Sequence, residues 1–356
     1  MKIPSLKIGD LIANIPIIQG GMSVGISLSG LASAVANEGG IGVIGTAGIG
    51  MSEPDFAVNF LEANIRALRK EIRKARGKTK GILGVNIMVA LTNFVDMVKT
   101  SVEEKIDIIF SGAGLPLDLP KYITKDSKTK LVPIVSSGRA AKLIAKAWKE
   151  KFNYIPDAFV VEGPLAGGHL GFKREELDDP NITLEERFKE VLYEVKILEE
   201  KYDKKVPVIP AGGIYNGEDI VKFLKMGANG VQMATRFVAT EECDASSNFK
   251  KAYISATKED VIIIKSPVGL PGRAIKNEFL ESVEKGGKKP FRCPFHCIKT
   301  CDYQNSPYCI ALALLNAKKG NLKEGFAFAG SNVYRIDKIV TVKSLINELK
   351  EEIEKT

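Results

Sequence analysis

The feature that most constrains the fold is a regular alternation of short apolar runs with longer amphipathic segments. Eight runs rich in β-branched residues occur at residues 15–19, 40–45, 81–88, 106–112, 130–137, 157–163, 206–213 and 230–237. Between most of them lie segments with helical patterning, such as DFAVNFLEANIRALRKEIRKA. Strands that are apolar along their whole length and alternate with helices predict a parallel sheet covered by helices.

Eight such units within about 240 residues fit a (β/α)8 barrel, whose usual size is about 250 residues. A doubly wound open sheet is the alternative. After about residue 240 the alternation stops, and the chain holds helical stretches, a PVGLPGR turn and a last helix rich in Lys and Glu. We therefore predict an α/β fold with a TIM barrel over residues 1–240. A C-terminal helical capping domain over residues 241–356 would cover the barrel mouth.

Composition narrows the class of protein. The chain is 45% hydrophobic and 26% charged, which is typical of a globular protein with a sizeable core. It has no apolar run long enough for a membrane helix and no secretory signal at the N-terminus, so we expect a cytoplasmic protein. The net charge of +8 comes from dispersed Lys on helix faces, which argues against nucleic-acid binding. The partner that we expect is a small-molecule substrate, and a homodimer is compatible with the sequence.

Glycine pairs follow several predicted strands, at the end of the barrel where active sites lie. They occur in QGGMS, in EGPLAGGHLG and in AGGI, while Asn86 ends the third strand. Glycine lets the backbone approach a flat or anionic ligand closely. Gly212 and Gly213 in the seventh loop, with Thr235 in the eighth, predict a phosphate site. Ordinary turn glycines and a helix cap are the alternative.

Residues 40–45, GIGVIG, match the glycine fingerprint of dinucleotide-binding folds. That fingerprint must lie between a strand and a helix, whereas these glycines lie inside a predicted strand. We interpret them as packing glycines.

His169 is one of only two histidines in the chain and follows a glycine pair on a predicted loop. An imidazole with a pKa near neutrality can take a proton from a carbon acid and can stabilise the resulting anion. A structural histidine bound to a loop carbonyl is the alternative.

Five segments in order, PIIQGGMSVGISLSGLASAVANEGGIGVIG, GVNIMV, EGPLAGGHLG, VPVIPAGGI and GVQMATRF, resemble the nitronate monooxygenase family. That family was formerly called 2-nitropropane dioxygenase and includes FMN-dependent enoyl-ACP reductase relatives. The resemblance implies an FMN-dependent barrel with a helical second domain and His169 as the catalytic acid/base. It implies oxidation of alkyl nitronates or nitroalkanes with O2, and alternatively an NAD(P)H-dependent reduction of an enoyl-thioester or a quinone.

The FMN contacts that we predict come from the resemblance and from the strand ends. They are Gln19, Gly20, Met22, Asn86, Glu162, Gly167, Gly168, Gly212, Gly213, Gln232, Met233, Ala234 and Thr235. Two of the three glutamines of the chain, Gln19 and Gln232, fall at predicted strand ends. Glu162 departs from the family, whose monooxygenases often have Gln there. A carboxylate near the pyrimidine edge of a flavin changes its hydrogen bonding and charge.

Four of the five cysteines gather in RCPFHCIKTCDYQNSPYC, at Cys293, Cys297, Cys301 and Cys309. The first three would share one face if a helix formed there. Four thiolates can hold an iron–sulfur cluster or zinc, with His296 as an alternative ligand, although the spacing matches neither common pattern. Reduced cysteines packed as small apolar groups are the alternative. A cluster would favour a reductase over an oxygenase.

Overall fold

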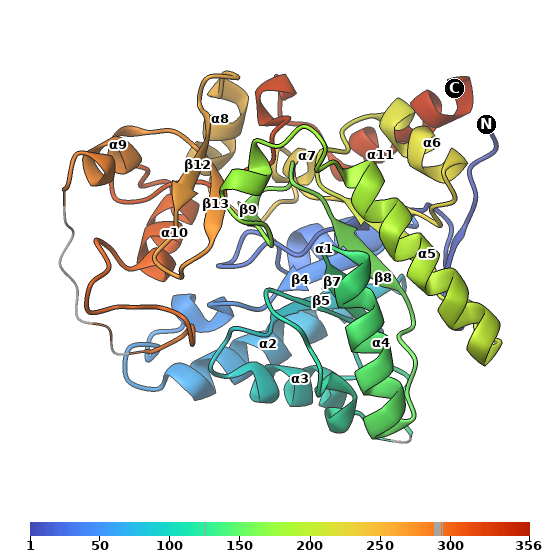
Figure 1. The fold of residues 1–356 in the computed structure, drawn as a ribbon. Helices are drawn as coiled ribbons and strands as arrows, with labels where there is room; N and C mark the ends of the chain where they lie inside the picture. Colours follow the sequence, from blue (N-terminus) through green and yellow to red (C-terminus); the bar gives the residue numbers. More distant parts are fainter. Residues whose placement is uncertain (125, 288–292, 294) are drawn as a thin grey trace.

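A computed structural model describes residues 1–124, 126–287, 293 and 295–356 (Figure 1). Eight parallel strands form one sheet in the order β3-β11-β10-β8-β7-β6-β5-β4. They are β3 (Ile17–Gln19), β4 (Gly42–Gly45), β5 (Leu83–Met88), β6 (Ile108–Gly112), β7 (Lys130–Val135), β8 (Phe159–Glu162), β10 (Val208–Ala211) and β11 (Val231–Met233). A parallel bridge between Ile18 and Ile41 brings the two ends of the sheet together. The predicted barrel and its eight strands are confirmed.

The helices that follow these strands form the outer layer. They are α1 (Ser29–Asn37), α2 (Phe60–Arg76), α3 (Phe94–Glu103), α4 (Gly138–Phe152), α5 (Leu184–Tyr202), α6 (Gly217–Lys225) and the short α7 (Thr235–Val238). Single 3-10 turns lie at η1 (Ile49–Ser52), η2 (Leu119–Tyr122), η3 (Glu175–Leu177) and η4 (Val333–Arg335). Several helices begin at polar caps that accept an N–H of the first turn, such as Ser137 before α4 and Thr183 before α5.

Alternating strand residues build two apolar cores. Residues such as Phe110, Val160 and Ile209 fill the barrel interior, while neighbours such as Phe159 and Val208 pack outward in the larger core that includes the helices. An N-terminal hairpin, β1 (Leu6–Ile8) and β2 (Leu11–Ala13), contributes Leu6 to the interior core. Each fully buried aliphatic or Phe side chain stabilises the fold by about 1.5–3 kcal/mol.

The glycines of residues 40–45 serve packing, as the sequence predicts. A Cβ added to Gly42 in β4 would lie 1.8 Å from the carbonyl oxygen of Ala32 in α1. Only glycine therefore lets α1 lie this close to the sheet.

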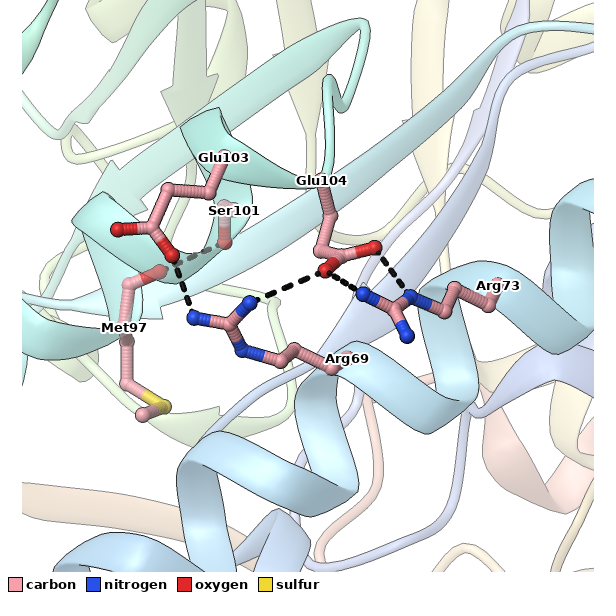
Figure 2. Close-up of polar contacts among 6 residues, drawn as sticks. All are labelled: Arg69, Arg73, Met97, Ser101, Glu103 and Glu104. Carbon is pink, nitrogen blue, oxygen red and sulfur yellow. Dashed lines mark hydrogen bonds and ion pairs between the residues drawn. The ribbon is translucent and has the colours of Figure 1, made fainter.

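Ion pairs join adjacent helices on the outside of the barrel. Figure 2 shows Arg69 and Arg73 of α2 reaching Glu103 and Glu104 at the end of α3. Arg73 binds Glu104 through two hydrogen bonds of 2.7 Å, which lower the pKa of that carboxyl. Because Arg73 is largely exposed, such a pair adds little to the stability of the fold.

The region after residue 240, predicted as a helical cap, contains strands as well as helices. It contains α8 (Ser247–Ser255), β12 (Val261–Lys265), β13 (Pro271–Ile275), α9 (Glu278–Glu284), α10 (Ile310–Lys318) and α11 (Val342–Lys355). The strands β12 and β13 form an antiparallel sheet with β9 (Gly168–His169), a two-residue strand from the barrel loop after β8. Pairing with a distant loop is a tertiary event that local patterning does not report.

The last helix does not lie over the mouth. α11 packs against α6 and α1, and Figure 1 places it on the far side of the molecule from α9 and α10. Its apolar face, which includes Leu345, Leu349 and Ile353, is buried in the same core as the barrel helices. The residues after 240 therefore do not all belong to a cap, and the domain boundary stays a prediction.

Within the described ranges, the structure has no helix long and apolar enough to span a membrane.

Candidate active site

A cavity of about 540 Å³ lies at the carboxyl ends of the barrel strands. Its floor includes the ends of β5, β7, β8 and β11. Its other walls come from α8, α10, the turn between β12 and β13, and the segment 328–330. We call the elements from α8 to α10, with β12 and β13, the added lobe. A cavity between barrel loops and such a lobe is the usual place for a ligand in this architecture.

Most of the predicted site residues line this one cavity. They are Gly20, Met22, Asn86, Glu162, Gly167, Gly168, His169, Gln232, Ala234 and Thr235. Segments as far apart as residues 20 and 235 thus meet at one place, as the strand ends predict. Gln19, Gly212, Gly213 and Met233 are not among the lining residues.

Gln19 makes its hydrogen bonds within the barrel, and its predicted contact with FMN stays a prediction. Its side chain is fully buried, donates from Nε2 to the carbonyl oxygen of Gly20 at 2.6 Å and accepts the N–H of Val43 at 3.0 Å. The rare residue therefore ties the end of β3 to β4. Met233 is likewise buried in the core outside the cavity.

Gly212 and Gly213 support a neighbouring loop. Both have left-handed φ angles, +93° and +91°, which favour glycine. A Cβ on Gly212 would lie 2.9 Å from Ala166, and one on Gly213 would lie 3.0 Å from Leu165. The loop after β10 therefore lies directly against the loop after β8, and the predicted phosphate role of these glycines stays a prediction.

The loop after β8 also meets the segment 329–331 backbone to backbone. A Cβ on Gly167 would lie 2.5 Å from the carbonyl carbon of Ala329. The N–H of Gly330 donates to Thr235 Oγ1 at 3.0 Å, which joins this segment to the start of α7. The next hydroxyl, Ser331 Oγ, is buried and has no hydrogen-bond partner among the residues that the structure describes. Three loops thus converge beside this buried hydroxyl, whose residue is not among those that line the cavity.

His169 is held by the added lobe, because it lies in β9 and pairs with Gly272 of β13. Its Nε2 lies 2.7 Å from Ser266 Oγ, and the ring of Phe328 packs edge-on at 4.9 Å between centroids. Burial lowers the pKa of His169 to about 4. The imidazole is therefore uncharged at neutral pH and fixed in place, rather than free on a flexible turn.

Arg273 fixes the loop that carries His169. It is almost fully buried on β13 and donates from Nη1 to the carbonyl oxygens of Pro164 and Ala166, at 2.6 Å each. Burial lowers its pKa to about 10, so the guanidinium remains charged at neutral pH. Hydrogen bonds from a buried charge are among the stronger ones in proteins.

Glu162 ends β8 and lines the cavity. Across the parts of the chain that the structure describes, its carboxyl has no hydrogen-bond or ion-pair partner. Burial is the cause that raises its pKa to about 7. A carboxyl of this kind is poised between its neutral and charged forms at physiological pH.

One side of the cavity is aromatic and aliphatic. Phe56 lies 5.3 Å from Phe60 and 4.7 Å from Phe295 between ring centroids. Met51 and Leu314 line the same side. This wall suits an apolar part of a ligand.

Comparison with known proteins agrees with this geometry. A family model described as nitronate monooxygenase matches residues 5–352. The chain belongs to the nitronate monooxygenase family. It is an oxidoreductase of that family, with the barrel and the added lobe that its strands and loops build.

Relatives within this range differ in their named activities. The chain is 24% identical over 310 residues to a probable nitronate monooxygenase of Staphylococcus saprophyticus, covering 80% of this chain and 82% of that protein. It is 27% identical over 273 residues to the (3aS,4S,5R,7aS)-5-hydroxy-7a-methyl-1-oxo-octahydro-1H-indene-4-carboxyl-CoA dehydrogenase of Mycobacterium tuberculosis, covering 77% of this chain and 66% of that protein. The structure of FabK from Thermotoga maritima matches with a TM-score of 0.71 and 29% identity, over 96% of this chain and 93% of that one.

The cysteine cluster does not form the helical face that its spacing would give. Cys293, Cys297 and Cys301 lie on irregular chain, and Cys309 immediately precedes α10. The Cys297 thiol lines the cavity, and burial together with the charges of the other three cysteines raises its pKa to about 12. Among the described residues, no group of three or more His, Cys, Asp or Glu side chains is placed to hold a metal ion. The predicted cluster or zinc site therefore finds no support in this geometry.

Several residues of the site were not predicted from the sequence. Ser266 and Phe328 contact the His169 ring although they lie 97 or more positions away in the sequence. Arg273 lies in β13, which pairs with β9, and it binds the loop that carries His169. The aromatic wall combines Phe56 and Phe60 with Phe295, which are also remote in sequence. The GFAFAGSNVYR segment resembles the same family weakly, which predicts a capping loop at Ala329, Gly330 and Ser331 beside the flavin, and Phe328, Ala329 and Gly330 line the cavity.

Proposed function

We propose that this chain is an FMN-dependent oxidoreductase that oxidises alkyl nitronates with O2. The observation that carries the proposal is the placement of an uncharged, immobilised His169 in the cavity built by the glycine-rich strand ends. Family membership and the probable nitronate monooxygenase relative support the same reaction class.

The residues present fit FMN. Glycine backbone lines the cavity at Gly20, Gly167, Gly168 and Gly330, and a Cβ added to Gly168 would meet nothing within 4 Å, so a flat ligand could approach the backbone there. Asn86 and Gln232 place amide groups on the cavity wall, where they would hydrogen-bond a flavin ring. Bound FMN would supply a two-electron acceptor that O2 can reoxidise.

His169 would hold or move the proton in this reaction. Its Nε2 contacts Ser266 Oγ, and no described residue holds Nδ1, so Nδ1 is the atom that we assign to the substrate. Because its pKa is about 4, the ring stays neutral above about pH 5 and can accept a hydrogen bond or a proton at that atom. Ser266 fixes the ring orientation, which is a positioning role.

A second candidate is an NAD(P)H-dependent reduction of an enoyl-thioester or a quinone. The wall of Phe56, Phe60 and Phe295 favours it, because a small nitronate leaves that apolar surface unused. In that reaction His169 would assist protonation of the reduced product, instead of taking a proton from a nitroalkane.

The test is to purify the protein without air, add FMN and follow flavin fluorescence and absorbance. We expect one FMN per chain, reduction of that flavin by an alkyl nitronate, and O2 consumption on aeration. Flavin bleaching by NADH or NADPH with no response to nitronate would select the second candidate instead. Failure to bind FMN would contradict both.

Variants separate chemistry from folding. His169→Gln should lower kcat about 10²-fold or more while leaving FMN affinity unchanged, since general acid/base groups contribute about 10²–10⁴-fold. Ser266→Ala should cause a smaller loss and Ser266→Thr, which keeps the hydroxyl, should recover part of it. Unchanged turnover in His169→Gln would remove the histidine from the proposed mechanism.

A further inference from the structure

Glu162 is the carboxylate in the wall of the cavity, and the proposed function gives it no role. It stands at the end of β8, between the barrel interior and the loop that leads to His169. No described residue donates a hydrogen bond to it, and no cation pairs with it. Its side chain is half-buried in the cavity wall, and a carboxyl with little water around it and no protein partner faces a high cost when it ionises.

The other titratable groups in the cavity wall do not change charge near neutral pH. Burial lowers the pKa of His169 to about 4 and raises the pKa of Cys297 to about 12. Tyr253 donates its hydroxyl to the carbonyl oxygen of Phe328, and burial raises its pKa further. Glu162 is thus the group in the described cavity wall that can gain or lose a proton there.

The described cavity wall also carries no lysine or arginine. Arg273 lies behind the loop after β8, where its guanidinium is bound to Pro164 and Ala166 and has Arg174 and Asp178 as charged neighbours. A ligand that becomes negatively charged in the cavity therefore meets no fixed cation in the wall. A proton is the cation that this wall can add.

We propose that Glu162 takes up a proton when the flavin bound beside it is reduced. Two electrons from the donor and one proton reduce the flavin, and a second proton from solvent forms the O–H bond of the Glu162 carboxyl. Reoxidation by O2 releases that proton. The physical reason is that the negative charge gained by the reduced flavin ring and the charge of a neighbouring carboxylate repel each other where the wall supplies no cation. This inference rests on the proposed function, because it assumes that FMN binds in this cavity.

The first experiment measures the reduction equilibrium of the bound FMN against a reference dye, without air, between pH 5.5 and 9. Above about pH 7, the ratio of reduced to oxidised FMN in the wild type should fall by an extra tenfold for each pH unit. The reason is that reduction then takes up one additional proton. Glu162→Gln has the same size and no titratable proton, so it should lack this extra dependence. The matched control is Glu150→Gln, an exposed residue of α4, which should behave as the wild type.

The outcomes are distinguishable. Equal pH dependence in the wild type and Glu162→Gln, with FMN bound to both, overturns this inference and leaves the proposed function intact. Absence of FMN binding to the wild type overturns both.

A second measurement needs no flavin. Because folding raises the pKa of Glu162 from 4.5 to about 7, the folded state binds this proton more tightly than the unfolded chain does. The stabilisation from it is present below about pH 4.5 and is lost as pH rises to about 7. Relative to Glu162→Gln, the folding equilibrium constant of the wild type should fall by up to about tenfold per pH unit in this window. A constant ratio between the two proteins would contradict the enclosed, unpaired state of Glu162.

Discussion

Single side chains set the chemistry of this site through their surroundings rather than through their identity. His169 is neutral because it is buried, and it is oriented because Ser266 and Phe328 contact its ring. Burial favours the neutral form of both groups, so it lowers the pKa of His169 but raises the pKa of Glu162. A base that stays uncharged and an acid that titrates near pH 7 therefore face one cavity.

The stability of the protein should depend on His169 in acid. Folding lowers its pKa from 6.5 to about 4, so the unfolded chain binds the proton first as pH falls. The wild type should lose up to about 3 kcal/mol of stability between pH 6.5 and 4 from this group. Urea unfolding of the wild type and of His169→Gln at several pH values measures this loss. The unfolding free energy of the wild type relative to that of His169→Gln should fall as the pH falls from 6.5 to 4. A difference that does not vary with pH would show that the ring is not held in its neutral form.

At the scale of elements, the site is built where a short strand joins two lobes. The strand β9 leaves the barrel after β8 and pairs with β13, and the turn after β12 brings Ser266 to His169. On the other side of the loop after β8, Gly167 packs against the segment at Ala329. The β9–β13 pairing therefore fixes the loop that carries His169 between the barrel and the added lobe.

Removing the guanidinium of Arg273 should loosen this loop. Arg273→Met leaves the carbonyl oxygens of Pro164 and Ala166 without their buried donor, and we expect a loss of about 3 kcal/mol or more in unfolding free energy. Hydrogen exchange at residues 164–169 should accelerate more than exchange in the barrel strands. Arg273→Lys keeps a charged donor and should recover part of the loss. Uniform exchange rates in all three proteins would show that the loop is held by other contacts.

At the scale of the whole molecule, the end of the chain belongs to the barrel. α11 packs on α6 and α1, Glu352 accepts the N–H of Gly217 at 2.6 Å, and Arg236 pairs with Glu348. Figure 1 shows both termini on this side, and the N-terminal amine donates to carbonyl oxygens near the end of α11. A segment that follows the added lobe in sequence thus returns to the barrel wall.

Shortening one side chain in the buried face of α11 should destabilise the whole barrel. Leu349→Ala removes a fully buried side chain, and we expect a loss of about 2–5 kcal/mol. Trp148, the only tryptophan, is buried in α4 on another part of the barrel, so its fluorescence reports on barrel unfolding. In Leu349→Ala, the unfolding midpoints followed by far-UV circular dichroism and by Trp148 fluorescence should fall together, as in a single transition. Asn347→Ala, an exposed change in the same helix, is the control, and an unshifted fluorescence transition in Leu349→Ala would indicate an independent terminal unit.

The sequence by itself determined the barrel and the end at which the site lies. Apolar runs that alternate with amphipathic helices leave few ways to bury a parallel sheet, and the ends of parallel strands must meet at one edge. Asn86, Glu162, His169 and Gln232 therefore line one cavity, as their positions at strand ends predict. Only the tertiary structure decided that Gln19 is bound inside the sheet, that Ser266 holds His169, and that α11 returns to the barrel. Those outcomes depend on contacts between segments far apart in the chain, and local periodicity carries no information about such contacts.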